Sequence, residues 1–573
     1  MSPRNLIVLF ICLTLAAVTA AAESGDVSKM LRDLADHTQA GMDRRLGPGY
    51  EFYHKQKTDP PAPTLYLPPD KEVIKGRSYQ IGGPYTKEAG DYSSTQGQIL
   101  YVPDQGLGVD RVNILQEDHN MVCQKPEIPW HGGFRPEPSA TKWQQAAGGN
   151  PGSPIGMARG MAQWSNCGVI VFSSGFVGAA GTVTASGTYP SLKLPPEKIP
   201  LAMTVSSRNE FAFVAVHDTQ LKRGQLAVIA LSSDGQGGKF VHEWPTPHPG
   251  LTSVGYLTGM KLLGYVDLPG MAAPSAVCAV GNSTVNRMNG PDGNAGLLRS
   301  YDLARQDHRD VFLKGTNAHY TSSAGFAVVI SRYENKAIFI DLEPLFKTAR
   351  EMYFTSEENY KNTLNQGPAP DQWPYTFEKE PGWAPKAIKT LDVKEPTAVI
   401  GSLAGGEKAR ALIASLDGTI GIYQVGGLAT DKPATPEQIN RVGEFKVGRN
   451  PVCLNYQKGS SDTFLAVSRG DREIAWFKVK GDSGEVTRRL RDSRMLDPVF
   501  VEQSDTHGIE TNLITVADFK GRKIINYRCS ELVFATQGGA RYKPGPDGKD
   551  EFECGGIMEF PGFPFCISAT NVN

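Results

Sequence analysis

The amino-acid sequence predicts an all-β fold, a seven-bladed β-propeller. The first observation is residues 442–480, where four short runs of β-branched and aromatic residues alternate with polar turns containing Gly448, Lys458 and Gly470. The second observation is that looser versions of this unit recur along the chain. The third is composition, because 62 Gly and 40 Pro in 573 residues favour many turns between short strands.

The recurring unit has a base period of about 45 residues, which suits a propeller blade of four strands. Each unit begins at a Pro or a polar turn, and its second strand is a short apolar run such as residues 211–216 or 464–467. Two intervals between units are longer and predict insertions. The predicted unit starts are Pro154, Pro200, Pro274, Asn317, Pro396, Pro451 and Pro498.

The ring is expected to close through both ends of the chain. Propellers usually complete one blade with strands from both termini, which hides the sheet edges. Residues 98–102 (QILYV) are a candidate strand for this role, paired with a strand near the C-terminus. An eighth, degenerate blade from residues 90–118 is the alternative to the count of seven.

The N-terminus has the pattern of an export signal. Arg4 precedes an apolar run over residues 6–17, and small residues suited to cleavage follow it. We therefore expect residues 1–22 to be a cleaved signal peptide and the protein to be periplasmic or secreted. The apolar run is short for a membrane span, so no transmembrane segment is expected. Residues 23–90 are expected to form a helix, over about 24–46, followed by an extended arm.

Residues 91–573 are expected to form the propeller, with insertions at residues 283–296 and 341–390. The first insertion is rich in Gly, Asn and Asp, which favours a loop. The second opens with a helical pattern near residues 341–365 and continues into a Pro/Trp-rich loop. The tryptophans of that loop could stack on a sugar, anchor a partner or fasten the loop to the ring. Long loops on a rigid scaffold often carry function.

The net charge and the cysteine content limit the possible classes of protein. A formal net charge of -1 provides no overall field for nucleic acid, so no nucleic-acid partner is expected. Of the 8 cysteines, Cys12 leaves with the signal, and the odd number that remains implies a free thiol or a pairing between chains. No CxxC or CxxCH motif supports a zinc knuckle or covalent haem. The disulfide pairing and the identity of any metal or cofactor stay open.

The repeat resembles the YVTN/lactonase-like family of β-propeller repeats over about residues 154–530. The resemblance rests on the order of a Val-Gly-x-x-Pro, as at Val447 to Pro451, an apolar strand, a polar turn and a third strand that resembles Val-x-Val-Ile-Asp. The nearest forms of the family tetrapeptide are Leu465-Ala-Val-Ser-Arg and Val328-Val-Ile-Ser-Arg, and Tyr-Val-Thr-Asn itself does not occur. The resemblance implies a propeller and is nearly silent on activity, because one fold hosts many functions.

The candidate binding residues lie on one face of the predicted ring. The loop that enters each inner strand and the turn between the second and third strands share that face. Asp, Asn and Gly also occur in tight turns for backbone reasons alone. Together, however, these residues would form a mixed-charge rim around the channel, suited to a polar small ligand, a sugar, a peptide or a partner protein. The candidates are His217, Asp218, Asn317, His319, Arg332, Glu395, Asp417, Arg449, Arg469, Asp471 and Asp518, to which the same register adds Asn282, Tyr333 and Asn450.

A metal site would need side chains from several blades. His217 with Asp218, His319, and His507 with Asp505 are the groups that could converge, and imidazole with carboxylate suits zinc, copper or manganese. Neither GxSxG nor HExxH occurs, so the motifs of serine hydrolases and zinc proteases are missing.

Two functions stay open. We favour an exported binding scaffold that recognises a protein or glycan partner through one face and its long loops, because no coherent catalytic set is visible. The alternative is a propeller enzyme with its site at the channel mouth, for which the resemblance allows a lactonase, a lyase or a metal-dependent oxidoreductase. Whether the chain is an enzyme, and its oligomeric state, stay open. Convergence of three or more members of one set would favour the enzyme: His217, His319, Arg332, Arg469, Asp471 and Asp518.

Overall fold

The structure of this chain is a computed structural model. It describes residue 31 and residues 45–54, 97–103, 112–117, 134–136, 145–149, 151–158, 168–180, 190–233, 257–283, 290–291, 301–363, 375–402, 406–430, 432–457, 461–492, 494–503, 509–510, 513–528, 533–534, 553–559 and 563–572. The expected signal peptide, nearly all of the expected helix at 24–46 and most of the loop at 283–296 lie outside these residues.

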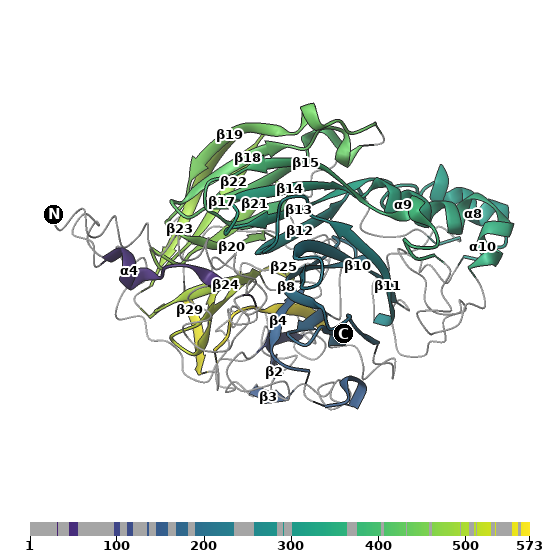
Figure 1. The fold of residues 1–573 in the computed structure, drawn as a ribbon. Coiled ribbons are helices and arrows are strands. Elements are labelled where there is room, and N and C mark those ends of the chain that lie inside the picture. The colour runs from purple at the N-terminus through teal and green to yellow at the C-terminus, as the bar shows by residue number, and fades with distance from the viewer. Residues whose placement is uncertain are drawn as a thin grey trace.

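Six four-stranded antiparallel sheets follow one another along residues 154–559, and each is a propeller blade (Figure 1). The first blade contains β4 (Pro154–Ala158), β5 (Gly168–Phe172), β6 (Phe176–Ala180) and β7 (Ser191–Lys193). The second contains β8 (Lys198–Val205), β9 (Phe211–Asp218), β10 (Arg223–Ser233) and β11 (Leu257–Asp267). The third contains β12 (Ala276–Gly281), β13 (Gly325–Ser331), β14 (Lys336–Asp341) and β15 (Lys386–Asp392).

The remaining three blades have the same antiparallel order. The fourth contains β16 (Pro396–Gly401), β17 (Arg410–Ser415), β18 (Thr419–Gln424) and β19 (Asn440–Lys446). The fifth contains β20 (Pro451–Tyr456), β21 (Thr463–Ser468), β22 (Glu473–Lys480) and β23 (Ser483–Arg491). The sixth contains β24 (Pro498–Gln503), β26 (Leu513–Asp518), β27 (Lys523–Arg528) and β29 (Glu553–Glu559), with a separate pair of β25 (Ile509–Glu510) and β28 (Val533–Phe534).

A closing sheet joins the two ends of the chain. It contains β1 (Gly97–Pro103), β2 (Val112–Glu117), β3 (Phe134–Pro136) and β30 (Ser568–Val572). β1 and β30 are antiparallel, with Ile99 opposite Thr570. β1 also contacts β4, and β30 contacts β24, so this sheet connects the last blade to the first. The predicted pairing of residues 98–102 with a C-terminal strand is therefore confirmed.

The all-β propeller is confirmed, but in the part of the chain that the structure describes the blade count is corrected to six, not seven or eight. The units predicted at Pro274 and Asn317 are one blade, because a long connection containing a helix separates its inner strand β12 from its second strand β13. Residues 90–118, the alternative eighth blade, supply β1 and β2 of the closing sheet.

Burial follows the position of each strand within its blade. Every residue of β9 and β13 is buried, because the middle strands are covered by neighbouring blades on both faces. The outer strands β15, β19 and β23 alternate between exposed and more buried positions, as expected for strands with one face in solvent. Apolar clusters accordingly fill the spaces between blades, as between the fourth and fifth.

Helices of the third blade form a group at one edge of the ring (Figure 1). The stacked rings of Phe312 and Phe354, with centroids 4.6 Å apart, hold α8 against η4, and the Arg350 guanidinium donates to the Phe312 carbonyl at 2.8 Å. The predicted helix near 341–365 is confirmed as three consecutive segments, whereas α8 was not predicted. The group contains α8 (Gln306–Leu313), α9 (Glu343–Arg350), the π-helical η4 (Glu351–Thr355), α10 (Glu357–Asn362) and the 3-10 turn η6 (Pro381–Trp383).

Further short helical segments lie elsewhere in the described part of the chain. One of them, α4, comes before the propeller, and the others are 3-10 turns between strands of the fourth blade. Their bounds are α4 (Tyr50–His54), η7 (Gly406–Lys408), η8 (Gly426–Ala429) and η9 (Pro436–Gln438). Among the described residues, no helix has the length and apolarity needed to cross a membrane.

Candidate functional site

The mouth of the central channel is covered by the chain's own residues 45–54, here called the mouth segment. It includes α4 and touches five of the six blades. Its partners include Ile155 on β4, Leu201 on β8 and Arg332 after β13. The turns around Arg469 in the fifth blade and Lys520 in the sixth also contact it. Several of the polar side chains predicted to form the rim therefore contact a segment of the same chain.

The rim binds the main chain of this segment. Arg332 Nη1 donates to the Arg45 carbonyl at 2.5 Å, and Arg469 Nη1 donates to the Gly47 carbonyl. Asn450 Nδ2 donates to the carbonyls of Leu46 at 3.1 Å and Pro48 at 2.7 Å. Four consecutive carbonyl groups are thus paired with side-chain donors, which they need because they lie at a helix end and in the irregular residues that follow it, where main-chain partners are missing.

Gly47 is required by the geometry of this contact. Its φ is +80°, in the left-handed region that side chains disfavour. A Cβ atom at this position would lie 2.3 Å from Nη2 of Arg332. Any larger residue would push the guanidinium away from the Arg45 carbonyl.

Two tyrosines of the mouth segment lie against arginines of the fifth blade. The Arg449 guanidinium lies 4.8 Å from the ring centre of Tyr53, and that of Arg472 lies 3.6 Å from the ring centre of Tyr50. Burial raises the pKa of Tyr53 to about 12, an effect that the neighbouring Arg449 opposes and Glu395 reinforces. Tyr53 is therefore a neutral phenol at physiological pH.

The predicted aspartates of the mouth hold the ends of its loops. Asp471 accepts a hydrogen bond from the Arg449 amide at 2.6 Å and from Arg449 Nε at 2.9 Å. Asp518 accepts from the amides of Leu496 and Asp497, both at 2.8 Å, and of Gly521 at 3.0 Å. Burial raises the pKa of Asp518, although these amides and Lys523 favour its ionised form. These contacts are those of turn residues that stabilise the scaffold.

Four other candidates have local partners at the same face. His217 Nδ1 lies 3.0 Å from the Ala272 carbonyl and therefore donates to it. The buried Asp218 pairs with Lys198, and Asp417 accepts from the Thr419 amide at 3.0 Å. The Glu395 amide donates to Asn335 Oδ1 at 2.9 Å.

Asn317 and His319 do not belong to the mouth. Both lie in the connection between β12 and β13, beside α8. Asn317 is buried there, and its Nδ2 donates to the Tyr301 hydroxyl at 2.9 Å. The register error that split the third blade placed these two residues on the wrong face.

The six residues whose convergence would favour an enzyme do not converge on one partner. Arg332 and Arg469 hold the mouth segment, whereas Asp471 and Asp518 hold loops, and His319 lies in the insertion. No group of three or more His, Cys, Asp or Glu side chains suited to a metal ion occurs among the described residues. The pair of Asp505 and His507, which the sequence offered as metal ligands, lies outside the described residues.

Below the mouth, the inner strands enclose a cavity of about 190 Å³. Its lining is largely apolar and includes Met157, Met203 and Cys278. Burial raises the pKa of the Cys278 thiol to about 12, so this thiol is protonated. Asn455 Nδ2 donates to Glu502 Oε2 at 2.6 Å, which pairs the two strongly polar lining groups with each other.

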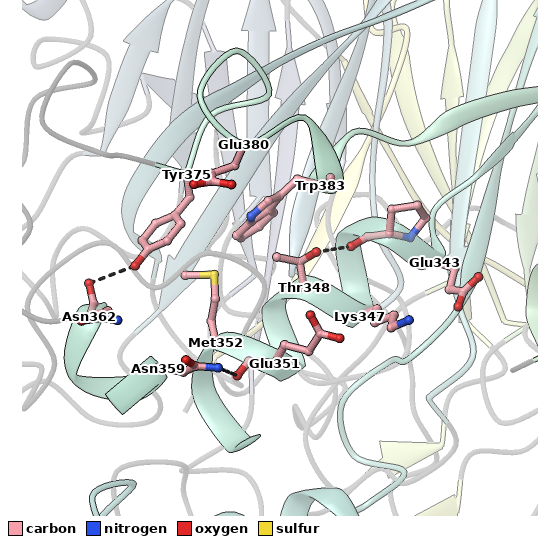
Figure 2. Close-up of a pocket in the computed structure, with 12 residues that line it drawn as sticks. Glu343, Lys347, Thr348, Glu351, Met352, Asn359, Asn362, Tyr375, Glu380 and Trp383 are labelled. Carbon is pink, nitrogen blue, oxygen red and sulfur yellow. Dashed lines mark hydrogen bonds between the residues drawn. The ribbon is translucent and has the colours of Figure 1, made fainter. Parts of the chain in front are cut away.

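A larger pocket, of about 580 Å³, lies in the helical insertion and is here called the insertion pocket (Figure 2). Met352, Tyr375 and Trp383 are turned toward one another on one side of it (Figure 2). Trp383 is buried, so it fastens its loop to the core, as one of the predicted alternatives proposed. The charged lining residues are Glu343, Lys347, Glu351 and Glu380.

Local geometry fixes the shape of the insertion pocket. The Tyr375 hydroxyl donates to the Asn362 carbonyl at 3.0 Å, which joins the loop to α10. Asn359 Nδ2 donates to the Glu351 carbonyl at 3.3 Å (Figure 2), and the Ser356 hydroxyl caps α10 by accepting from the Asn359 amide. Sequence reasoning identified the insertion but not the pocket, because its walls combine the helices α9, η4 and α10 with the Pro/Trp-rich loop that follows them.

The fold defines the chain as a β-propeller, in agreement with the fold-level resemblance found in the sequence. No protein-family model matches the chain, and no curated protein matches it either. A periplasmic gluconolactonase from Pseudomonas aeruginosa is similar in structure, with a TM-score of 0.41, 12% identity, and coverage of 84% of this chain and 100% of the other. A putative 6-phosphogluconolactonase from Bacteroides uniformis has a TM-score of 0.41, 9% identity, and coverage of 83% and 100%.

A third structure with a similar fold is also a β-propeller. The β-propeller domain of Cps50 (Swd1) from Myceliophteria thermophila has a TM-score of 0.33 and 9% identity, and it covers 73% of this chain and 90% of its own. At these identities the likeness concerns the fold.

Proposed function

We propose that this chain is a binding scaffold for a protein partner and that the insertion pocket is its contact site. The observation that supports this most directly is that the polar residues of the mouth contact other parts of the same chain. The arginines and the asparagine of the rim hold the mouth segment, and the aspartates hold loops. The insertion pocket instead presents charged side chains around a large space, which is where a partner can add contacts.

The chemistry of the insertion pocket suits a basic side chain. Among the described residues that line it, the carboxylates Glu343, Glu351 and Glu380 outnumber the single cation Lys347. Among the described residues, these three carboxylates form no ion pair. An arginine from a partner could place its guanidinium among them and its methylene stem against Met352, because arginine combines a fixed charge with an apolar stem.

The proposed scaffold acts outside the cytoplasm. This part of the proposal rests on the N-terminal pattern of Arg4 and the apolar run at 6–17, which resembles an export signal. The proposal keeps residues 1–22 as signal, 23–90 as arm and 91–573 as propeller.

The test is direct binding of three probes to the purified full chain. The probes are a hexa-arginine peptide, a hexa-glutamate peptide and a chitohexaose oligosaccharide. We expect the arginine peptide to bind and the double variant Glu351→Gln/Glu380→Gln to weaken its binding about tenfold, equivalent to about 1.4 kcal/mol. The net charge of the whole chain is -1, so a general attraction for cations does not explain such an effect.

The matched control changes two exposed carboxylates outside the pocket. Glu437 precedes β19, and Glu485 lies on β23, so Glu437→Gln/Glu485→Gln alters net charge equally. This variant should bind the arginine peptide like the unmodified chain. Equal loss in both variants would contradict the proposed site, and binding of the oligosaccharide alone would replace the protein partner with a glycan.

A further inference from the structure

We propose that the channel mouth is an exchangeable peptide-binding site. Its resident ligand is the mouth segment, residues 45–54, and the same segment supplied from a second copy can take its place. The inference concerns a different surface from the insertion pocket and does not depend on the function proposed for that pocket.

The first argument is that recognition is directed at the main chain. Arg332, Asn450 and Arg469 donate to the four carbonyls of residues 45–48, so the site recognises main-chain groups of the bound segment. Charged donors make such hydrogen bonds stronger than neutral ones. The same geometry is available to any chain that presents these carbonyls in this conformation.

The second argument is that selectivity is also built into the contact. The Arg332 side chain occupies the space that a Cβ atom at position 47 would need, which favours glycine there. Tyr50 and Tyr53, three residues apart, each lie against an arginine. A peptide with Gly, Pro and Tyr in the order of residues 47–53 therefore fits, and one with a branched residue in place of the glycine does not.

The third argument is that the mouth segment is weakly anchored by apolar contact. Among residues 45–53 only Gly47 is buried, whereas Glu51 is exposed and Phe52 is 56% exposed. The segment also belongs to none of the described sheets. Segments with few buried apolar contacts open at a lower free energy than core strands.

The fourth argument is the length of the tether. Residues 55–96 separate the mouth segment from β1, and 42 residues can span at most roughly 140–150 Å when extended. This length is enough for the segment of one copy to reach the mouth of another. Exchange of an identical element between copies is a low-cost route to association.

The experiment uses one substitution to release the mouth segment, so that the emptied site can be tested with an added peptide. Gly47→Val in the full chain should release its own segment, because valine disfavours the φ of +80° at this position and the new side chain also meets Arg332. A labelled peptide with the sequence of residues 44–54 is then added, and binding is measured by fluorescence anisotropy. We expect it to bind the Gly47→Val chain and to bind the unmodified chain at least about tenfold more weakly, since there the tethered segment competes.

Two pairs of matched variants test the specificity. Asn450→Asp replaces the amide donor with a carboxylate, so Gly47→Val/Asn450→Asp should lose the peptide, while the same change at the exposed Asn440 should not. Gly148 also has a positive φ but has open space around it, so Gly148→Val should behave like the unmodified chain. A peptide carrying valine in place of glycine should fail to bind.

Three results with these variants would overturn the proposal. The first is a folded Gly47→Val chain that does not bind the peptide, and the second is equal binding after Asn450→Asp. The third is a Gly47→Val chain that does not fold, since the segment would then be an obligatory part of the fold. Hydrogen exchange of the unmodified chain gives an independent check: the amides of residues 50–53 should exchange at least about tenfold faster than those of β9 and β13, and equal protection would contradict the proposal.

Discussion

Arg469 connects the mouth segment to the fifth and sixth blades. Its guanidinium is fully buried, donates to both carboxylate oxygens of Asp497 at 2.7 and 2.9 Å, and also donates to the Gly47 carbonyl. Replacing Arg469 with Met should lower the free energy of unfolding by about 3–5 kcal/mol, because Asp497 is left buried without its partner. Urea denaturation of the full chain measures this loss.

An exposed pair of the same type provides the control. Arg305 donates two hydrogen bonds to Asp307, but both side chains are more than half exposed. Solvent screens such a pair, so Arg305→Met should leave the urea midpoint unchanged. If the two variants lost equal stability, burial would not be the reason for the effect at Arg469.

His217 should make stability depend on pH. Burial lowers its pKa below the usual 6.5, although Asp218 and Glu334 oppose the shift. The unfolded chain therefore binds the proton more readily, and the contribution of neutral His217 to stability is complete above pH 6.5 and declines as the pH falls below it. His217→Asn retains a donor for the Ala272 carbonyl but does not titrate.

The measurement is the free energy of unfolding between pH 7 and pH 5. The decrease toward pH 5 should be smaller in His217→Asn than in the unmodified chain. The half-buried His308 on α8 provides the matched His→Asn substitution, and the decrease toward pH 5 should be smaller in His217→Asn than in His308→Asn. An unchanged slope in His217→Asn would show that other groups cause the pH dependence.

The closing sheet is the element on which the ring depends. β30 pairs with β1 over five residue pairs and contacts β24. Deleting residues 568–573 removes β30 and exposes an edge of β1, so we expect the thermal midpoint to fall by at least about 5 °C and aggregation to increase. Removal of Asn573 alone is the control, and an equal midpoint in both chains would mean that β30 does not hold the ring closed.

The helical insertion is the element that distinguishes this propeller. Its helices pack on each other through aromatic rings, as Phe312 does with Phe354, and Arg350 joins them through the carbonyls of Phe312 and Ala318. This internal core explains how the insertion keeps an open pocket at the edge of the ring.

Much of the whole molecule follows from the sequence. Apolar runs such as 211–216 and 464–467 predict middle strands correctly, because both faces of those strands are buried between blades. The blade count was wrong because the run at 277–280 has the same composition but forms an inner strand. Periodicity alone does not distinguish these two positions.

The candidate site was predictable only in part. Shared loop geometry placed Arg332, Arg449 and Arg469 on one face, and the structure brings all three to the mouth segment. Nothing in the periodicity indicated that residues 45–54 would lie there. The contact joins positions about 290 to 420 residues apart, and its main-chain hydrogen bonds leave a sequence signal only at Gly47.

The most direct measurement is the position at which a basic peptide attaches to the full chain. A hexa-arginine peptide with a terminal benzophenone group is irradiated with the protein, and the cross-linked fragments are identified by mass spectrometry. We predict adducts on residues 343–383, around Glu351 and Trp383. Adducts on the mouth, at residues 449–472 or 45–54, would contradict the insertion pocket as the contact site and return the partner to the channel.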